Sequence, residues 1–275
     1  MNQILFEEKI NAALNEIGAK KLSYDRSEEW TYKEVYEELW RYAHSNQLYH
    51  LALALPLVRA LVDGQYRGSI ILEDGQTHPL PHFHHCCIVC RLLLNLHPVP
   101  AGSDEEDILL ASALCHDLIG HVFYQNPREA LRTYHLDPQI YEIISFINCY
   151  ELKTEDALRD FYQRFYSPDR CFEILIELAD YCCIIEKLYT EPIWKVREYI
   201  YLIRTYHLPL GVYAKEAFPE LYAPIGVMIE KMRSLSDATD ILVSRYEHRS
   251  LELHNELFAL KEENARYRRL ISEFK

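Results

Sequence analysis

The adjacent residues His116 and Asp117 bring together two side chains that bind metal ions well. A neutral imidazole supplies a borderline nitrogen ligand and a carboxylate supplies a hard oxygen ligand, a mixture that suits Mn, Fe, Co, Ni or Zn. The chain contains 13 histidines, so one His-Asp pair could also occur at the surface by chance. The pair therefore indicates a metal site only if further ligands and suitable helices accompany it.

Asp180 is a candidate ligand because of the helix expected to carry it. Ile176, Ala179, Cys183 and Ile184 recur around it at three- and four-residue spacing, which predicts an apolar helix face pointing to the core. A carboxylate on such a face needs a cationic partner, since an unpaired buried charge is costly. A metal ion and a buried salt bridge to Lys or Arg are the two alternatives.

Together with His85, these residues follow one another in the order His, His-Asp, Asp. This order and the flanking sequences PHFHHCCIVC, ASALCHDLIGH and IELADYCCIIEK resemble the HD superfamily of metal-dependent phosphohydrolases. The resemblance covers about residues 82 to 190. It implies that His85, His116, Asp117 and Asp180 bind one divalent transition metal ion, which activates a water molecule to attack a phosphate ester.

The candidate catalytic residues are Asp117 and His121. His121 follows the His-Asp pair closely and could donate a proton to the leaving oxygen or bind a phosphate. A histidine after Gly120 could equally be a helix cap. Substrate-binding candidates are His84, Arg91 and Arg128, and either His82 or His84 could replace His85 as the first ligand.

The resemblance favours hydrolysis of a small phosphate ester, either a phosphomonoester or a phosphodiester, and in particular of a nucleotide. Two alternatives stay open. One is a nucleotide or metal sensor or scaffold without turnover. The other is an HD-type oxygenase with two irons, because additional histidines occur at positions 82, 84, 121 and 135.

Composition limits the partners and the cellular location. The formal net charge of −13 argues against a nucleic-acid polymer, whose binding relies on basic residues. The eight cysteines fall in segments expected to be helical and no secretory leader is recognisable, so we expect reduced thiols. No apolar run reaches the length of a membrane span and no secretory leader is recognisable. These features predict a cytoplasmic protein that does not enter a membrane.

The pattern of elements predicts an all-α protein built around an HD-type helical bundle. Ser103 and Glu106 form a capping box, so a helix should begin there, run to the His-Asp pair and end at Gly120. Further helices are expected near residues 84–96, 127–134, 138–150, 154–165 and 169–190. The expected divisions are N-terminal helices over 1–62, a β-hairpin over 63–81, the HD domain with a helical extension over 82–233, and a C-terminal helix over 234–275.

Three segments outside the expected HD core have their own signals. Ser69 to Glu73 followed by Asp74-Gly75 predicts a hairpin, which could cover an active site or simply join two helices. Prolines in residues 191–233 predict short helices separated by turns. The C-terminal helix has an apolar seam that could form a parallel homodimer or dock on the chain itself. The seam comprises Leu253, Leu257, Leu260, Asn264, Tyr267, Ile271 and Phe274.

Overall fold

The computed structural model describes residues 3–16, 33–62, 64–71, 77–121, 134–148, 154–186, 188 and 191–273. The fold is all-α with one β-hairpin, as predicted. Its elements are α1 (Gln3–Glu16), α2 (Lys33–Asn46), α3 (Tyr49–Leu61), β1 (Tyr66–Ile71), β2 (Thr77–Pro81), α4 (His82–Leu96), α5 (Asp104–Cys115), α6 (Leu118–His121), α8 (Pro138–Ile147), α9 (Glu155–Gln163), α10 (Cys171–Ile185), α11 (Ile193–Leu202), η3 (Ile203–His207), α12 (Leu208–Ala217), η4 (Pro219–Leu221) and α13 (Tyr222–Glu273).

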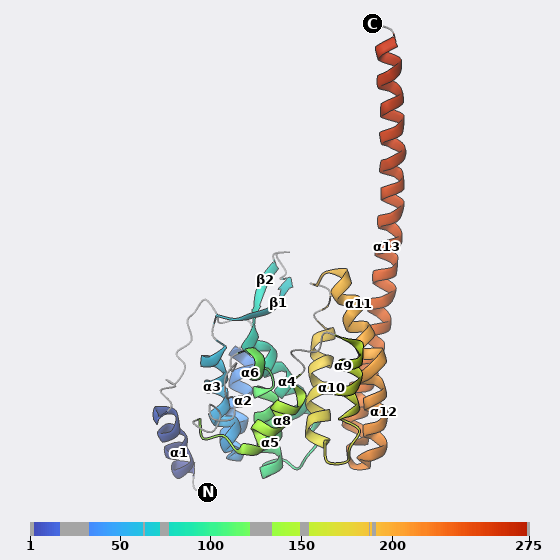
Figure 1. The fold of residues 1–275 in the computed structure, drawn as a ribbon. Helices are drawn as coiled ribbons and strands as arrows, with labels where there is room; N and C mark the ends of the chain where they lie inside the picture. The colour runs from blue at the N-terminus through green and yellow to red at the C-terminus, as the bar shows by residue number, and fades with distance from the viewer. Residues whose placement is uncertain are drawn as a thin grey trace.

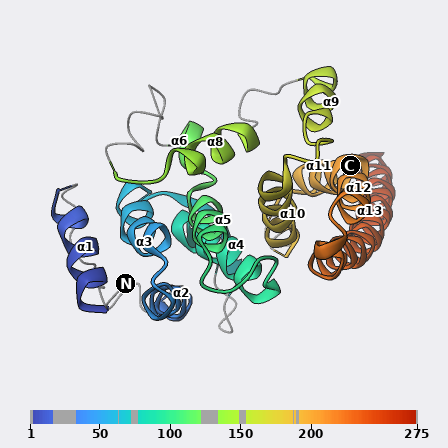
Figure 2. The ribbon, with the colours of Figure 1, turned by 90° about the horizontal axis from the view of Figure 1, so that it is seen from below.

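Helices α4 and α5 form the centre of the bundle (Figure 2). Helices α1, α2 and α3 pack on one side of them, and α10 packs against α4 on the other side. Helices α12 and α13 form an outer layer behind α10. The two helices that carry the first and last expected ligands, α4 and α10, are therefore neighbours in the fold.

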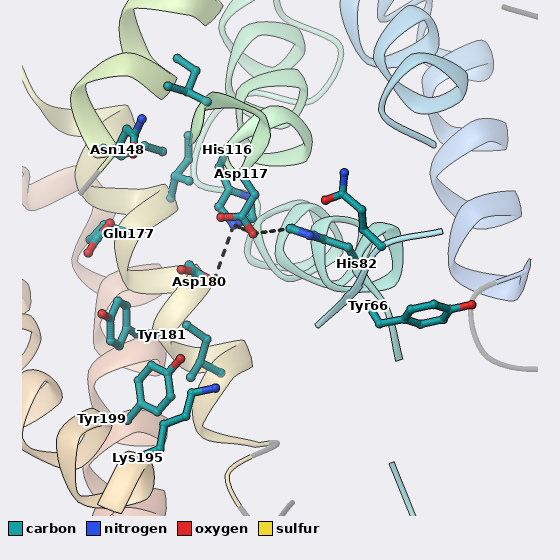
Figure 3. A pocket seen from close by; sticks show the side chains of 15 residues that line it. Tyr66, His82, His116, Asp117, Asn148, Glu177, Asp180, Tyr181, Lys195 and Tyr199 are labelled. Atoms are coloured by element: carbon teal, nitrogen blue, oxygen red, sulfur yellow. Dashed lines mark hydrogen bonds and ion pairs between the residues drawn. The ribbon is translucent and has the colours of Figure 1, made fainter. Parts of the chain in front are cut away.

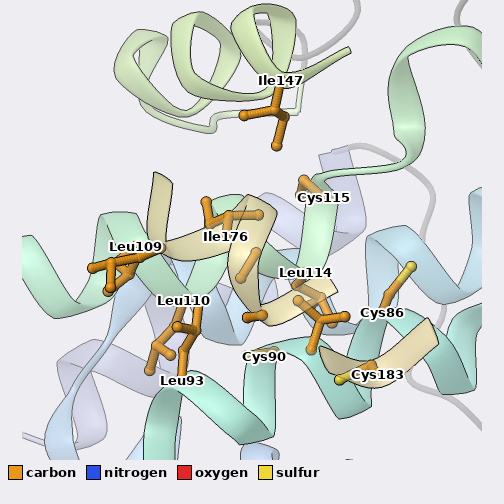
Figure 4. Close-up of a cluster of buried hydrophobic side chains, with 14 of the residues drawn as sticks. Cys86, Cys90, Leu93, Leu109, Leu110, Leu114, Cys115, Ile147, Ile176 and Cys183 are labelled. Atoms are coloured by element: carbon orange, nitrogen blue, oxygen red, sulfur yellow. The ribbon is translucent and has the colours of Figure 1, made fainter. Parts of the chain in front are cut away.

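The core between α4, α5, α8 and α10 consists of small and branched apolar side chains (Figure 4). Burying each of the larger side chains contributes roughly 1.5–3 kcal/mol relative to leaving it exposed. The seven cysteines that the structure describes are reduced thiols, as predicted. Burial raises the pKa of Cys90 and Cys115, so both thiols stay protonated and act as small apolar groups.

Helix α5 begins where the capping box predicted. Ser103 Oγ accepts a hydrogen bond from the backbone N–H of Glu106 at 3.1 Å. The Glu106 carboxylate accepts in return from the N–H of Gly102, which has a φ of 73°, rather than from that of Ser103. The end of the helix differs from the prediction, because α5 stops at Cys115 and Gly120 lies inside the short helix α6.

Strands β1 and β2 pair antiparallel, which confirms the predicted hairpin. Ser69 lies opposite Pro79, while the predicted Asp74-Gly75 turn falls outside the described residues. The backbone N–H of His82 donates to the carbonyl oxygen of Gln65 at 2.9 Å. The base of the hairpin is therefore bonded to the first residue of α4.

Residues 193–217 correct the prediction of short helices separated by turns. Helix α11 continues through the π-helical turn η3 into α12 without leaving helical geometry. Pro209 lies just after the junction of η3 and α12, where its missing N–H removes one backbone hydrogen bond from the continuous helix. The widened turn before it accommodates the proline ring, and His207 Nδ1 in this turn donates to the Leu202 carbonyl oxygen at 3.0 Å.

Helix α13 is 52 residues long and begins at Tyr222, so it crosses the expected boundary at residue 234. Its first part packs against α10 and α12, and its second part projects away from the bundle (Figure 1). The seam residues Leu253, Leu257 and Leu260 are 50%, 49% and 61% exposed. These three leucines therefore do not dock on the bundle, which was one of the two alternatives.

Candidate metal centre

Three elements bring the four expected metal ligands together. His85 lies in the first turn of α4, His116 and Asp117 form the turn between α5 and α6, and Asp180 lies on α10. His85 Nε2 is 2.8 Å from Asp180 Oδ1 and 3.6 Å from Asp117 Oδ2. His116 Nε2 is 3.3 Å from Asp117 Oδ2 and 3.7 Å from Asp180 Oδ1. Four ligand atoms from distant parts of the chain thus point at one another.

These separations fit a shared metal ion. Ligand atoms that bind one ion at about 2.0–2.2 Å lie roughly 3–3.5 Å from their neighbours in tetrahedral or octahedral geometry. The observed separations run from 2.8 to 3.7 Å. Two carboxylates and two neutral imidazoles would also balance the charge of one divalent ion. The donor set and its spacing therefore fit a divalent transition metal, whose identity the geometry does not select.

The ring of His116 is oriented for metal binding. Its Nδ1 lies 2.8 Å from the Ala113 carbonyl oxygen, which can only accept, so Nδ1 carries the proton. Its Nε2 is then a lone-pair donor, and this buried atom makes no hydrogen bond within the described part of the chain. A buried imidazole nitrogen held in this tautomer beside two carboxylates is suited to a metal ion.

His82 and Cys86 extend the centre on one side. His82 Nε2 lies 2.9 Å from Asp117 Oδ2. The ligand atoms of His82, Cys86 and Asp117 all lie within 4.8 Å of one another, and those of His85, His116 and Asp180 form a second such group. Three histidines of α4 were candidates for the first metal ligand. Two of them, His82 and His85, lie close to Asp117.

A cavity of about 430 Å³ opens beside these ligands (Figure 3). Its wall combines acidic, basic and aromatic side chains from the hairpin, α8, α10 and α11. The residues that line it are Gln65, Tyr66, His82, His116, Asp117, Ile119, Ile147, Asn148, Ile176, Glu177, Asp180, Tyr181, Ile184, Lys195 and Tyr199. The base of the hairpin thus forms part of the cavity wall through Gln65 and Tyr66.

A buried polar cluster lies next to this cavity. His207 is fully buried, and its Nε2 lies 3.0 Å from Glu177 Oε1 and 3.1 Å from Tyr162 Oη. Tyr162 donates its hydroxyl hydrogen to the same Glu177 oxygen at 3.1 Å. Since His207 Nδ1 also contacts a carbonyl oxygen, this cluster fixes the side chain of Glu177 in the cavity wall.

The remaining predicted site residues are not among the described residues that line the cavity. His84 is half-buried and Arg91 contacts Glu38 at 3.8 Å, and the described lining of the cavity includes neither of them. Arg128 lies outside the described residues, as does the side chain of His121. The structure therefore brings the metal ligands together but leaves the predicted substrate contacts as predictions.

Sequence reasoning missed the residues that α11 contributes to the cavity. Lys195 and Tyr199 are four residues apart, so they share one face of α11. That spacing is a weak signal, because it matches any amphipathic helix. Asn148, Glu177 and Tyr181 were missed too. Of these, Glu177 could have been found, because it lies three residues before Asp180 and therefore on the same face of α10.

Comparison with known proteins adds no relative. No protein-family model matches the chain, and no curated protein matches it. No helix in the described ranges is long and apolar enough to cross a membrane. The chain is thus a helical protein with buried His, Asp and Cys groups that could hold a metal ion, an arrangement compatible with an HD domain.

Proposed function

We propose that this protein is an HD-type phosphohydrolase that uses a divalent metal ion to hydrolyse a small phosphate ester, in particular a nucleotide. One observation carries the proposal: His85, His116, Asp117 and Asp180 converge at 2.8–3.7 Å beside a cavity. Their order in the sequence resembles the HD pattern. A divalent ion held there would supply a water of lowered pKa and an electrophile for phosphoryl oxygens.

The protein side chains would orient the ligands and exclude water. Ala113 holds the ring of His116, and His82 holds the carboxylate of Asp117. Such supporting contacts fix the direction of a ligand's lone pair. His116 and Asp180 are only 7% and 9% exposed, so their charges act in a poorly solvated site.

The cavity also offers groups for the rest of the substrate. Lys195 is the basic residue in the described lining, and its Nζ lies 2.9 Å from Glu191 Oε2. A phosphate oxygen could take the place of that carboxylate. The rings of Tyr181 and Tyr199 lie 6.2 Å apart at 69° and present flat apolar surface to a nucleobase.

We also propose a cytoplasmic location and a homodimer. The exposed leucines at 253, 257 and 260 provide an apolar stripe that a second copy of α13 could cover. The second copy is favoured because the seam follows a heptad pattern with charged flanks. The net charge of −13 argues against a nucleic-acid polymer as a partner.

Phosphate release from a panel of nucleotides tests the function. The chelator-treated chain should be inactive, and Mn²⁺ or Co²⁺ should restore release. His116→Ala should lose bound metal and release together, with its helical circular dichroism largely preserved. His248→Ala is a matched control, because this histidine is exposed on α13 and contacts Glu252. Stoichiometric metal in His116→Ala would place the site elsewhere, and metal binding without release of phosphate from any nucleotide would favour the sensor.

A further inference from the structure

We propose that the chain binds a second metal ion, through His82, Cys86 and Asp117, next to the ion held by His85, His116 and Asp180. The ligand atoms of the first three residues lie within 4.8 Å of one another. His82 and Cys86 are 2% and 1% exposed, so two of the three ligands are deeply buried, and Asp117 is partly exposed. This inference rests on the metal centre of the proposed function and differs from the single ion expected from the sequence.

The geometry of α4 explains how one helix can serve both positions. His82 and Cys86 are four residues apart and lie on one face, one turn above the other. His85 lies between them in sequence and is rotated toward α10, where it contacts Asp180 at 2.8 Å. In Figure 3, His82 and Asp180 approach the His116-Asp117 pair from opposite sides. Two groups of ligands therefore flank one central carboxylate.

Asp117 is placed to bridge two ions. Its Oδ2 lies 2.9 Å from His82 Nε2, 3.3 Å from His116 Nε2 and 3.6 Å from His85 Nε2. It thus touches ligands of both groups, and a carboxylate has two oxygens to share. Carboxylate-bridged ions in hydrolytic two-metal sites lie about 3.5–4 Å apart, a distance that one carboxylate spans.

The two positions differ in the metals they favour. The first offers imidazole and carboxylate groups, whereas the second adds the sulfur of Cys86, which lies at the edge of the core cluster in Figure 4. A thiolate is a soft ligand that favours Zn²⁺ or Co²⁺ over Mg²⁺ or Mn²⁺. The second position should therefore take a thiolate-binding metal.

Charge balance supports the pair of ions. Asp117 and Asp180 offset two of the four positive charges on two divalent ions, and a Cys86 thiolate offsets a third. Binding therefore releases the Cys86 proton. An anionic substrate group such as a phosphate would offset the fourth charge. A buried site of this kind binds ions only when its charges nearly cancel.

Titration of the chelator-treated full chain with Co²⁺ alone tests the inference. Metal analysis should find two Co²⁺ per wild-type chain, with a thiolate-to-cobalt charge-transfer band in the near ultraviolet. Cys86→Ala and His82→Ala should each bind one Co²⁺, and Cys86→Ala should lack the band. Cys87→Ala is the matched control and should keep both ions and the band, because Cys87 is buried in the core and belongs to neither ligand group.

Cys86→Ser is a second variant for the case that Cys86→Ala does not fold, because serine nearly preserves the volume of the side chain and removes the sulfur. It should abolish the band with an unchanged helical spectrum. A wild-type chain that binds one Co²⁺ without the band overturns the second site, and phosphate release by that chain would leave the proposed function intact. In that case His82 only orients Asp117. A chain that binds no Co²⁺ overturns both proposals, and a band that survives Cys86→Ala overturns the role of this thiol.

Discussion

Replacing Asp180 with asparagine should separate the stability of the metal-free protein from its stabilisation by metal. In the metal-free chain, Asp180 is a carboxylate only 9% exposed, with Oδ1 near two histidine nitrogens. Asn keeps the size of this side chain but removes the charge that would offset the ion. We therefore expect Asp180→Asn to lower metal affinity while changing the metal-free melting temperature little.

The size of the effect follows from the number of ligands. Loss of a supporting residue around a metal costs about 10–100-fold in affinity, so loss of a direct anionic ligand should cost at least about 100-fold. With metal at a thousand times the wild-type Kd, binding adds about 4.1 kcal/mol of stability. After a 100-fold loss it adds about 1.4 kcal/mol. The difference of about 2.7 kcal/mol corresponds to roughly 5–10 °C in Tm for a chain of this size.

Calorimetric melting of wild type and Asp180→Asn, each with chelator and with Co²⁺ or Mn²⁺, measures this difference. Glu173→Gln is a matched control on the same helix. It removes a carboxylate 5% exposed that pairs with Arg170 at 2.8 Å, away from the metal ligands. Glu173→Gln should leave the metal-induced shift in Tm unchanged. Equal metal-induced shifts in wild type and Asp180→Asn, with only a lower metal-free Tm in the variant, would refute the ligand role.

Two further predictions concern the rest of the fold. His207→Phe should lower the free energy of unfolding by about 3 kcal/mol, because it leaves the buried Glu177 carboxylate with fewer partners. Adding Glu177→Leu should recover part of that loss in a double-mutant cycle, and strict additivity in chemical denaturation would contradict the coupling. Truncation after Glu247 should convert a dimer to a monomer in sedimentation experiments without unfolding the bundle. A truncated chain with the subunit number of the full-length protein would contradict the α13 seam.

The elements that sequence predicted best are those with local signals. Ser103 and Glu106 sit three residues apart at the start of an apolar run, and α5 begins there. The apolar stripe around Asp180 likewise predicted a buried carboxylate, because periodicity depends on residues within one helix. The continuous helix through Pro209 was missed, since a π-helical turn has no simple sequence signature.

The cavity was harder to predict than the ligands. Lys195 and Tyr199 line the cavity together with Asp117, although α11 lies far from Asp117 in the sequence. That placement depends on packing between distant segments, which periodicity within one helix does not encode. The role of Cys86 was missed for a related reason. A buried cysteine usually serves as a small apolar group, and only its position beside His82 and Asp117 indicates another use.

Small side chains explain why the ligands can approach so closely. Helices α4 and α5 pack together, and Cys86 and Cys90 of α4 lie near Cys115 of α5, all at most 1% exposed. The distance between packed helices depends on the side chains at their contact, so small residues let α4 bring its histidines near the turn after α5. Larger apolar residues would stabilise the core but separate the ligands. The same packing places Asp117 and the buried Asp180 among histidines, so part of the stability of the bundle should depend on the bound metal.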